Sequence, residues 1–475
     1  MMNEPTATTT QAETQLDEAG VTELKTQLRG ALLRPGDAGY DAARSIWNGM
    51  VDKRPALIAR CTATADVIAA VNFARTHHLL LAVRGGGHNV AGSAMCDGGL
   101  VIDLSAMRGV MVDPSARVAH VQPGLTWGEL DHETQAFGLA TPGGIVSATG
   151  VAGLTLGGGF GWLSRKYGLT SDNLRSVKLV TADGQFVTAS EREHPDLFWG
   201  VRGGGGNFGI VTDFEFQLHP VGPKVMAGLV FYPIEQAREV LHFYREYAAS
   251  APDELSTMAV LRIAPPAPFL PKHFHGTPVI GIAVCYVGSL EEGERVLRPL
   301  KNFGAPIADV IEPKPFVRHQ TLLDTASPNG RHYYWKSEYL PGLSDAALET
   351  VINYSRQLSS PLTAVLLFQL GGTIRRMDEQ ATAAGNRDAE FVLNIQSSWL
   401  EPGESQQHVQ WTRAFWTAMR PFSTGGVYMN FLSMDEGEER VRAAYGSNYR
   451  RLVTVKNSYD PTNLFRVNHN IKPAR

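Results

Sequence analysis

The sequence predicts an α+β protein built from two parts, each with its own sheet. Short strand-like runs separated by glycine-rich turns occupy residues 30–220, whereas longer strands alternate with amphipathic helices across residues 224–425. The Pro- and Gly-containing segment 219–223 separates the two patterns. A chain of 475 residues is also long enough for two or three domains.

One clear helix and a series of short strands are expected in the first part. Residues 64–75 place apolar side chains at helical spacing, and Thr64 is expected as the N-cap. Weaker helical spacing covers residues 21–33, and residues 1–20 are expected to form a tail. Strand-like runs lie at 79–83, 100–104, 116–121, 177–181, 185–188 and 210–218. The turn Ala182-Asp183-Gly184 predicts a hairpin between the fourth and fifth of these runs.

The second part is expected to contain a sheet with helices packed on it. Strands are expected at 225–231, 277–287, 364–370 and 391–396, and helices at 234–248 and 346–358. A short helix is expected near the C-terminus, within residues 443–475.

Composition and charge exclude several classes of protein. Hydrophobic residues make up 43% of the chain and charged residues 19%, which is typical of a globular protein. The net charge of −4 argues against a nucleic-acid or anionic-membrane partner. No run of about 20 apolar residues predicts a membrane span, and no secretory signal is evident, so we expect a cytoplasmic protein. The three cysteines, Cys61, Cys96 and Cys285, are expected to be reduced thiols, and no metal site is expected.

Glycine is enriched and gathers in three clusters, at residues 85–92, 143–161 and 203–209. Glycine allows backbone N–H groups to converge on an anion, because it accepts positive φ and has no Cβ. Three such loops in one part favour a large phosphorylated cofactor, although tight turns between short strands are the alternative for each cluster.

The glycine spacing of the third cluster matches that of a nucleotide-binding motif. Gly204-x-Gly206-x-x-Gly209 has the spacing of the dinucleotide fingerprint, which requires a helix immediately after it. Residues 210–218 alternate like a strand instead. The sequence therefore argues against a Rossmann site and favours a cofactor held by loops between strands.

Five blocks of the sequence resemble one family. They are Arg84-Gly-Gly-Gly-His88, residues 157–173 beginning Gly-Gly-Gly-Phe-Gly, residues 196–212 beginning Asp-Leu-Phe-Trp, Tyr428-Met-Asn-Phe431, and residues 460–470 ending Asn-His-Asn. In content and order these blocks resemble the berberine bridge enzyme-like oxidases, which belong to the vanillyl-alcohol oxidase superfamily of FAD-linked oxidoreductases.

The resemblance implies a two-part PCMH-type FAD-binding domain with short strands and helices. Its parts are expected at residues 21–222 and 430–475, and a substrate domain with an antiparallel sheet covered by helices is expected between them, at 223–429. It also implies FAD attached through His88 by an 8α-histidyl bond. The expected cofactor-binding residues are Arg84, Gly85, Gly86, Gly87, His88, Asn89, Gly92, Pro142, Gly143, Gly144, Val146, Ser147, Thr149, Gly150, Gly153, Gly157, Gly161, Asp172, Asn173, Gly209, Ile210, Val211, Asn468 and Asn470.

Two departures from the family pattern change what the resemblance implies, one for the number of covalent bonds to FAD and one for the ionisation of the catalytic tyrosine. Bicovalent members carry a second attachment cysteine eleven residues before Gly157, where this chain has Val146, so a single covalent bond is expected. Some members have Lys-x-Gln on a strand of the substrate domain, where this chain has Asn394-Ile395-Gln396. A lysine there favours a phenolate on the catalytic tyrosine, and its absence puts phenolate character at Tyr428 in doubt.

The resemblance also implies hydride transfer from an organic substrate. Tyr428 is the expected base and Gln396 an orienting residue, while a merely hydrogen-bonded, buried tyrosine is the alternative. A small or medium-sized substrate is expected: an alcohol, a sugar hemiacetal, an amine or a natural-product ring. Molecular oxygen is the expected electron acceptor; the alternatives are a dehydrogenase with another acceptor and a binding protein that retains FAD as structure.

Overall fold

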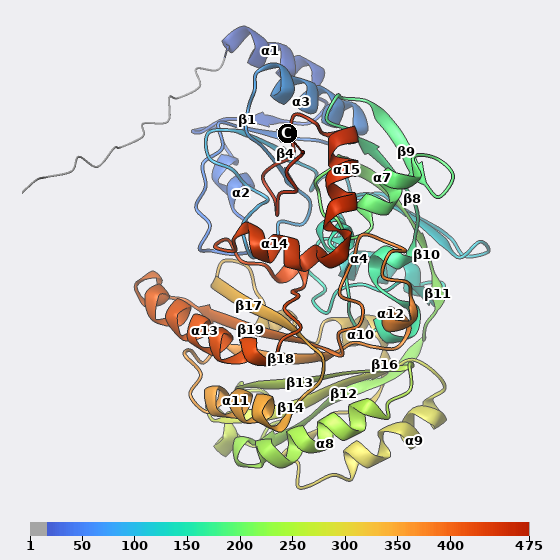
Figure 1. The fold of residues 1–475 in the computed structure, drawn as a ribbon, viewed down its shortest axis with the longest axis vertical. Helices are drawn as coiled ribbons and strands as arrows, with labels where there is room; N and C mark the ends of the chain where they lie inside the picture. The colour runs from blue at the N-terminus through green and yellow to red at the C-terminus, as the bar shows by residue number, and fades with distance from the viewer. Residues whose placement is uncertain (1–16, 475) are drawn as a thin grey trace, which may run out of the picture.

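The computed structural model describes residues 17–474, and its strands fall into two groups of sheets (Figure 1). The first group comes from residues 32–220 and the second from residues 224–399. After the second group the chain returns to the first through helices α14 (Glu438–Tyr445) and α15 (Tyr449–Tyr459), drawn in red in the upper half of Figure 1. The predicted α+β fold with an antiparallel sheet covered by helices is confirmed.

The first group consists of two main sheets. A four-stranded sheet has the order β1 (Leu32–Leu33), β2 (Leu57–Arg60), β4 (Leu100–Asp103), β3 (Leu81–Arg84), and β2, β4 and β3 run parallel. A five-stranded antiparallel sheet has the order β5 (Val110–Asp113), β6 (Val118–Val121), β10 (Ile210–Gln217), β8 (Leu174–Val180), β9 (Phe186–Ser190). Strands β7 (Leu139–Ala140) and β11 (His219–Pro220) form a small additional pair.

Short helices cover and connect these sheets. They are α1 (Glu18–Gln27), α2 (Tyr40–Arg44), α3 (Thr64–Thr76), α4 (Trp127–Gln135), α5 (Val151–Leu156), α6 (Ser164–Tyr167) and α7 (Pro195–Val201). Helix α3 buries Val67, Ala70 and Val71 in a core shared by the parallel strands and by residues of β8 and β10. This core ties the two sheets together and fixes the loops at their ends.

The second group is a single eight-stranded antiparallel sheet. Its order is β15 (Ala308–Asp309), β12 (Lys224–Pro233), β14 (Pro278–Tyr286), β13 (Leu255–Ile263), β18 (Ala364–Gln369), β19 (Phe391–Trp399), β17 (His332–Leu340), and β16 (Glu312–Pro315) also pairs with β12. Its connections include helices α8 (Ala237–Ala249), α9 (Leu290–Lys301), α10 (Phe316–Gln320), α11 (Asp345–Ser355), α12 (Thr373–Arg376) and α13 (Ser405–Met419).

The two faces of this large sheet have different partners because side chains alternate along each strand. On β13, Leu255, Ala259 and Leu261 pack with α8, α9, α11 and α13, of which α8, α9 and α11 lie beneath the sheet in Figure 1. Met258 and Val260 point to the opposite face and meet residues of the first part. The face opposite the helices is therefore the one available to a site between the two parts.

Two local expectations need correction, and a third is confirmed. Ala63, not Thr64, occupies the N-cap position of α3. The carboxylate of Asp66, in the first turn of this helix, accepts hydrogen bonds from the N–H groups of Arg29 and Thr62 instead, so it organises the preceding loops. The predicted tail lies mostly outside the described residues, and its residues 18–20 belong to α1. The expected free thiols are confirmed: all three cysteines are buried and unpaired in the described chain.

Candidate functional site

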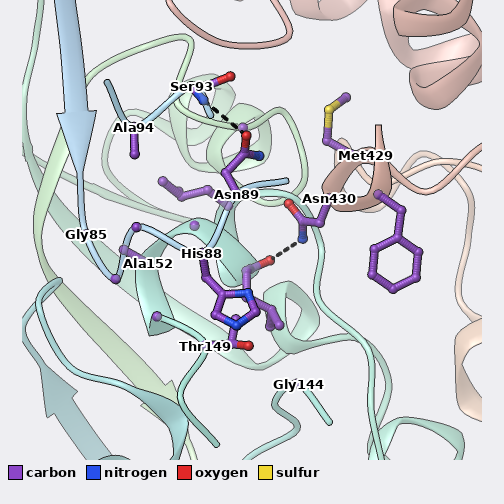
Figure 2. A pocket seen from close by; sticks show the side chains of 18 of the residues that line it. Gly85, His88, Asn89, Ser93, Ala94, Gly144, Thr149, Ala152, Met429 and Asn430 are labelled. Carbon is purple, nitrogen blue, oxygen red and sulfur yellow. Dashed lines mark hydrogen bonds between the residues drawn. The ribbon is translucent and has the colours of Figure 1, made fainter. Parts of the chain in front are cut away.

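A cavity of about 290 Å³ lies between the glycine-rich loops of the first part and the face of the large sheet that is opposite α8, α9, α11 and α13. Figure 2 shows residues of the glycine-rich loops that line it, together with Met429 and Asn430. The loops after β3 and β7 form one wall, β13, β18, β19 and β17 form another, and the segments 428–431 and 465–469 complete it. It brings together many of the predicted residues, namely Gly85, Gly86, Gly87, His88, Asn89, Gly144, Val146, Thr149, Gly150, Gly153, Gly209, Ile210, Val211, Gln396, Tyr428 and Asn468.

The loop after β3 presents a row of free backbone donors. The N–H groups of Gly86, Gly87, His88 and Asn89 have no hydrogen-bond acceptor anywhere in residues 17–474. Gly87 has a φ of +69°, which turns the chain and is readily available only to glycine. Asn89 fixes the end of the loop by accepting a hydrogen bond from the N–H of Ser93 at 3.2 Å (Figure 2). Four successive unpaired donors form an arrangement that suits phosphate oxygens.

Two glycine clusters meet at this loop without side chains between them. A Cβ on Gly86 would lie 2.5 Å from the Cα of Gly150, and a Cβ on Gly150 would lie 2.6 Å from the nitrogen of Gly86. Glycine at both positions therefore permits the loops to touch. Gly153 and Gly206 also border the cavity, and a Cβ on either would project into open space. The bare backbone at these positions leaves room for a flat or extended ligand.

His88 lies inside the cavity wall with one ring nitrogen unused. Its Nε2 is fully buried and has no hydrogen-bond partner among the described residues. Trp47 stacks on the imidazole, with ring centroids 4.3 Å apart, and Tyr333 stacks on the other face of Trp47 at 3.7 Å. Burial lowers the pKa of His88 to about 4, so the ring is neutral at physiological pH. A neutral, oriented imidazole with a free nitrogen is able to act as a nucleophile or ligand.

The C-terminal segment contributes further unpaired polar atoms. Asn468 and His469 line the cavity, and the Oδ1 of Asn468 and the Nε2 of His469 are buried without partners. Lys456 holds this segment in place, because its ammonium group donates to the carbonyl of Phe465 and pairs with Asp460 at 2.7 Å. The segment thus brings donors and acceptors to the cavity from the far end of the chain.

Tyr428 and Gln396 reach the cavity from opposite sides. The amide of Asn430 donates to the Tyr428 hydroxyl at 2.8 Å. Burial raises the pKa of Tyr428 above its ordinary value, the hydrogen bond from Asn430 opposes part of this rise, and no cation among the described residues lies beside the hydroxyl. The side-chain atoms of Asn394, two residues from Gln396 on β19, are buried without partners in the described chain. These surroundings favour a protonated Tyr428, and its role as a base stays a prediction of the sequence.

The remaining predicted cofactor residues do not line the cavity. They are Arg84, Gly92, Pro142, Gly143, Ser147, Gly157, Gly161, Asp172, Asn173 and Asn470. Asp172 accepts two hydrogen bonds from the Arg387 guanidinium, at 2.9 and 2.6 Å, and Arg84 donates to the carbonyl of Ala43. Gly143 lies against the ring of Trp127, where a Cβ has no room. Asp172, Arg84 and Gly143 thus make contacts within the protein, and cofactor contact by the ten residues stays a prediction.

Ser147 has a role that the sequence did not indicate. Its N–H and its hydroxyl both donate to the carboxylate of Asp324, at 2.9 and 2.5 Å. Asp324 belongs to the loop 321–331, whose Leu323, Ala326 and Ser327 line the cavity. The pair therefore joins the first part to a loop of the second part at the cavity edge.

Several cavity residues were missed by sequence reasoning. Arg262 lines the cavity and Trp47 stacks on His88, and neither carries a periodic or motif signal that separates it from ordinary core or loop residues. Asn430 stands in the block Tyr428–Phe431, but no role was expected for it. Trp335 on β17 also lines the cavity. For Arg262, the available signal was one charged residue in an otherwise apolar run, 258–263.

Two further classes of site are not found in the described chain. Residues 17–474 contain no group of three or more histidine, cysteine or carboxylate side chains arranged to hold a metal ion. None of the helices in the same range is both long and apolar enough to cross a membrane.

Comparisons with known proteins agree with the geometry. A family profile described as FAD binding domain matches residues 55–190, and one described as Berberine and berberine like matches residues 427–472. An FAD-linked oxidoreductase of Dictyostelium discoideum is 34% identical over 96% of this chain and 97% of that protein. The (R)-6-hydroxynicotine oxidase of Paenarthrobacter nicotinovorans is 32% identical over 94% of this chain and 97% of that protein.

A solved structure shows the same arrangement. The crystal structure of 6-hydroxy-D-nicotine oxidase from Arthrobacter nicotinovorans superposes with a TM-score of 0.84 and 30% identity, covering 94% of this chain and 98% of that one. The unpaired N–H groups, the bare glycine walls and the free nitrogen of His88 fit a dinucleotide cofactor such as FAD. The chain therefore belongs to the berberine bridge enzyme-like family of FAD-linked oxidoreductases.

Proposed function

We propose that the chain is an oxidase that holds FAD through one covalent bond to His88 and oxidises a small or medium-sized organic molecule, with O₂ as the electron acceptor. The observation that carries the proposal is the buried, unpartnered Nε2 of His88 directly beside the unpaired N–H groups of residues 86–89. A dinucleotide joined to the imidazole would use both features at once.

Different residues of the chain would bind different parts of the cofactor. The N–H groups of Gly86, Gly87 and Asn89 would bind the pyrophosphate, and Asn468 would add polar contacts from the C-terminal segment. Trp47 holds the imidazole flat against its own ring and keeps it neutral by excluding water. Val146 offers no thiol, which supports a single attachment. Bound FAD supplies the hydride acceptor; the residues around it orient the substrate.

Tyr428 and Gln396 are proposed as substrate contacts. With Asn430 donating to its oxygen, the Tyr428 hydroxyl is free to direct its own hydrogen into the cavity. Gln396 offers both a donor and an acceptor from the sheet. A neutral tyrosine suits a substrate such as a neutral amine or an activated alcohol, which needs orientation more than deprotonation. The name of the Paenarthrobacter relative, an oxidase of 6-hydroxynicotine, supports both an amine-like substrate and O₂.

The attachment is tested by acid precipitation of the purified yellow protein. We expect the colour in the pellet, and a tryptic peptide containing His88 heavier by one FAD. The variant His88→Ala should release its flavin into the supernatant, whereas His132→Ala, at an exposed position on α4, should behave as the wild type. Colour in the wild-type supernatant would show that the bond does not form.

The electron acceptor is tested separately. An oxidase releases hydrogen peroxide in air with any substrate that bleaches the flavin under argon. Anaerobic bleaching without peroxide in air would instead indicate a dehydrogenase that uses another acceptor. If no substrate bleaches the flavin, FAD has a structural role and the enzymatic proposal is wrong.

A further inference from the structure

Four residues form a row across the cavity face of the large sheet. Arg262 on β13 pairs with Ala364 on β18, Ala364 pairs with Gln396 on β19, and Gln396 pairs with Trp335 on β17. All four line the cavity. Because neighbouring strands lie about 4.8 Å apart, the backbones of Arg262 and Gln396 are separated by about 10 Å. Only the methyl group of Ala364 stands between their side chains.

The cation at the end of this row has no anionic partner. No carboxylate in residues 17–474 forms an ion pair with Arg262, whose Nε donates a hydrogen bond to the carbonyl of Ile263 at 3.2 Å. Burial lowers the pKa of the guanidinium, and the positive charge of Arg331 acts in the same direction. Arg262 is half-buried, and an arginine withdrawn even partly from water is commonly paired, because removing a charge from water is costly. The cavity therefore contains an uncompensated positive charge.

The next row of the same face begins with two apolar residues and continues to Asn394 and Ser337, which do not line the cavity. Val260 pairs with Leu366, one step along β13 and β18 from Arg262 and Ala364, and both line the cavity. Trp335 adds an aromatic wall at the far end of the first row. A ligand with one anionic end and an apolar or aromatic body matches this distribution of charge and surface.

We propose that Arg262 binds the carboxylate of the substrate, and that the enzyme acts on small organic acids with an apolar body. The inference rests on the proposed oxidation in this cavity and names its substrate class. The acid end lies at Arg262, and the row leads from there over Ala364 to Gln396, the proposed contact for the reacting end. The free N–H donors of the guanidinium suit a bidentate carboxylate.

The test is binding, measured by calorimetry on the purified protein as it is isolated. The probes are matched pairs that differ in charge and little in shape: benzoate and benzamide, phenylacetate and phenylacetamide, and indole-3-acetate and indole-3-acetamide. We expect at least one acid to bind tenfold or more tightly than its amide. In Arg262→Met this preference should disappear, whereas Arg262→Lys should retain part of it. Arg298→Met, at an exposed position on α9, should bind as the wild type.

A stability measurement separates a binding role from a structural one. Arg262→Met removes a charge that no carboxylate balances, so its melting temperature should equal or exceed that of the wild type. A lower melting temperature with unchanged acid preference would mean that Arg262 supports the fold, and the inference would be wrong. It would also be wrong if no acid bound more tightly than its amide, or if Arg262→Met altered only the flavin spectrum.

These outcomes are independent of the proposed covalent bond. Acid preference that depends on Arg262 would stand even if acid precipitation released the flavin. Conversely, flavin held in the pellet with equal binding of acids and amides would support the oxidase and overturn the carboxylate site.

Discussion

At the residue scale, no cation among the described residues lies beside the Tyr428 hydroxyl. This leads to a prediction about how the activity of a Tyr428 variant depends on pH. Since burial raises the pKa of this hydroxyl, it stays protonated from about pH 6 to 9. Tyr428→Phe should lower kcat/KM about tenfold or more, as expected for a lost substrate hydrogen bond, and the ratio of wild type to variant should not change with pH. The measurement is a pH profile with any substrate found by peroxide release. A ratio that climbs with pH and levels off below pH 9 would instead identify a phenolate base.

Site residues that lie in short sequence motifs could be predicted, whereas those brought in from distant segments could not. His88, Gly150 and Tyr428 lie in short motifs whose spacing is visible along the chain, and the structure brings them into one cavity. Arg262 lines that cavity and Trp47 stacks on His88 because segments far apart in sequence come together, so nothing local marks either residue. Asp172 was expected at the cofactor because its block is diagnostic of the family. The structure instead assigns it to an ion pair with Arg387.

At the element scale, periodic segments were predictable and interrupted ones were not. Residues 212–217 alternate between buried and partly exposed side chains, residues 210 and 211 before them are buried, and the whole segment forms β10 as expected. Strand β17 was missed because Lys336 and Glu338 break its apolar pattern. These two side chains are buried in ion pairs with Glu436 and Arg440, which lie about 100 residues further along the chain. A strand stabilised by such distant charges gives no local signal.

The loop 321–331 yields a prediction at this scale. The carboxylate of Asp324 accepts both hydrogen bonds from Ser147, and a charge-assisted hydrogen bond is about twice as strong as a neutral one. Asp324→Asn should therefore loosen the loop, so that trypsin cleaves after Arg318 or Arg331 several-fold faster and KM rises. Asp309→Asn, which breaks a pair with Lys301 on the outer sheet edge, serves as the control. Equal cleavage rates for Asp324→Asn and wild type would contradict the proposed role of this contact.

At the scale of the whole molecule, buried histidines make the fold sensitive to acid. Burial lowers the pKa of His219 and His469 to about 4 and that of His319 to about 3, all below the ordinary value of 6.5. The unfolded chain takes up protons below pH 6.5, whereas these folded histidines stay neutral, so the free energy of unfolding falls as the pH drops from 6.5 toward 4. Asp131 has the opposite effect, because burial raises its pKa and its folded form gains a proton first.

His319 allows this effect to be isolated. Both of its ring nitrogens are buried without partners in the described chain, and its ring packs on Trp162 at 4.5 Å, so phenylalanine fits the same space. One such histidine changes the free energy of unfolding by about 1.4 kcal/mol per pH unit. Between pH 7 and 5, urea unfolding should therefore show His319→Phe gaining about 2 kcal/mol relative to the wild type. The same substitution at exposed His132 should give no pH-dependent gain. A constant difference between His319→Phe and wild type across this range would mean that His319 takes up its proton without unfolding.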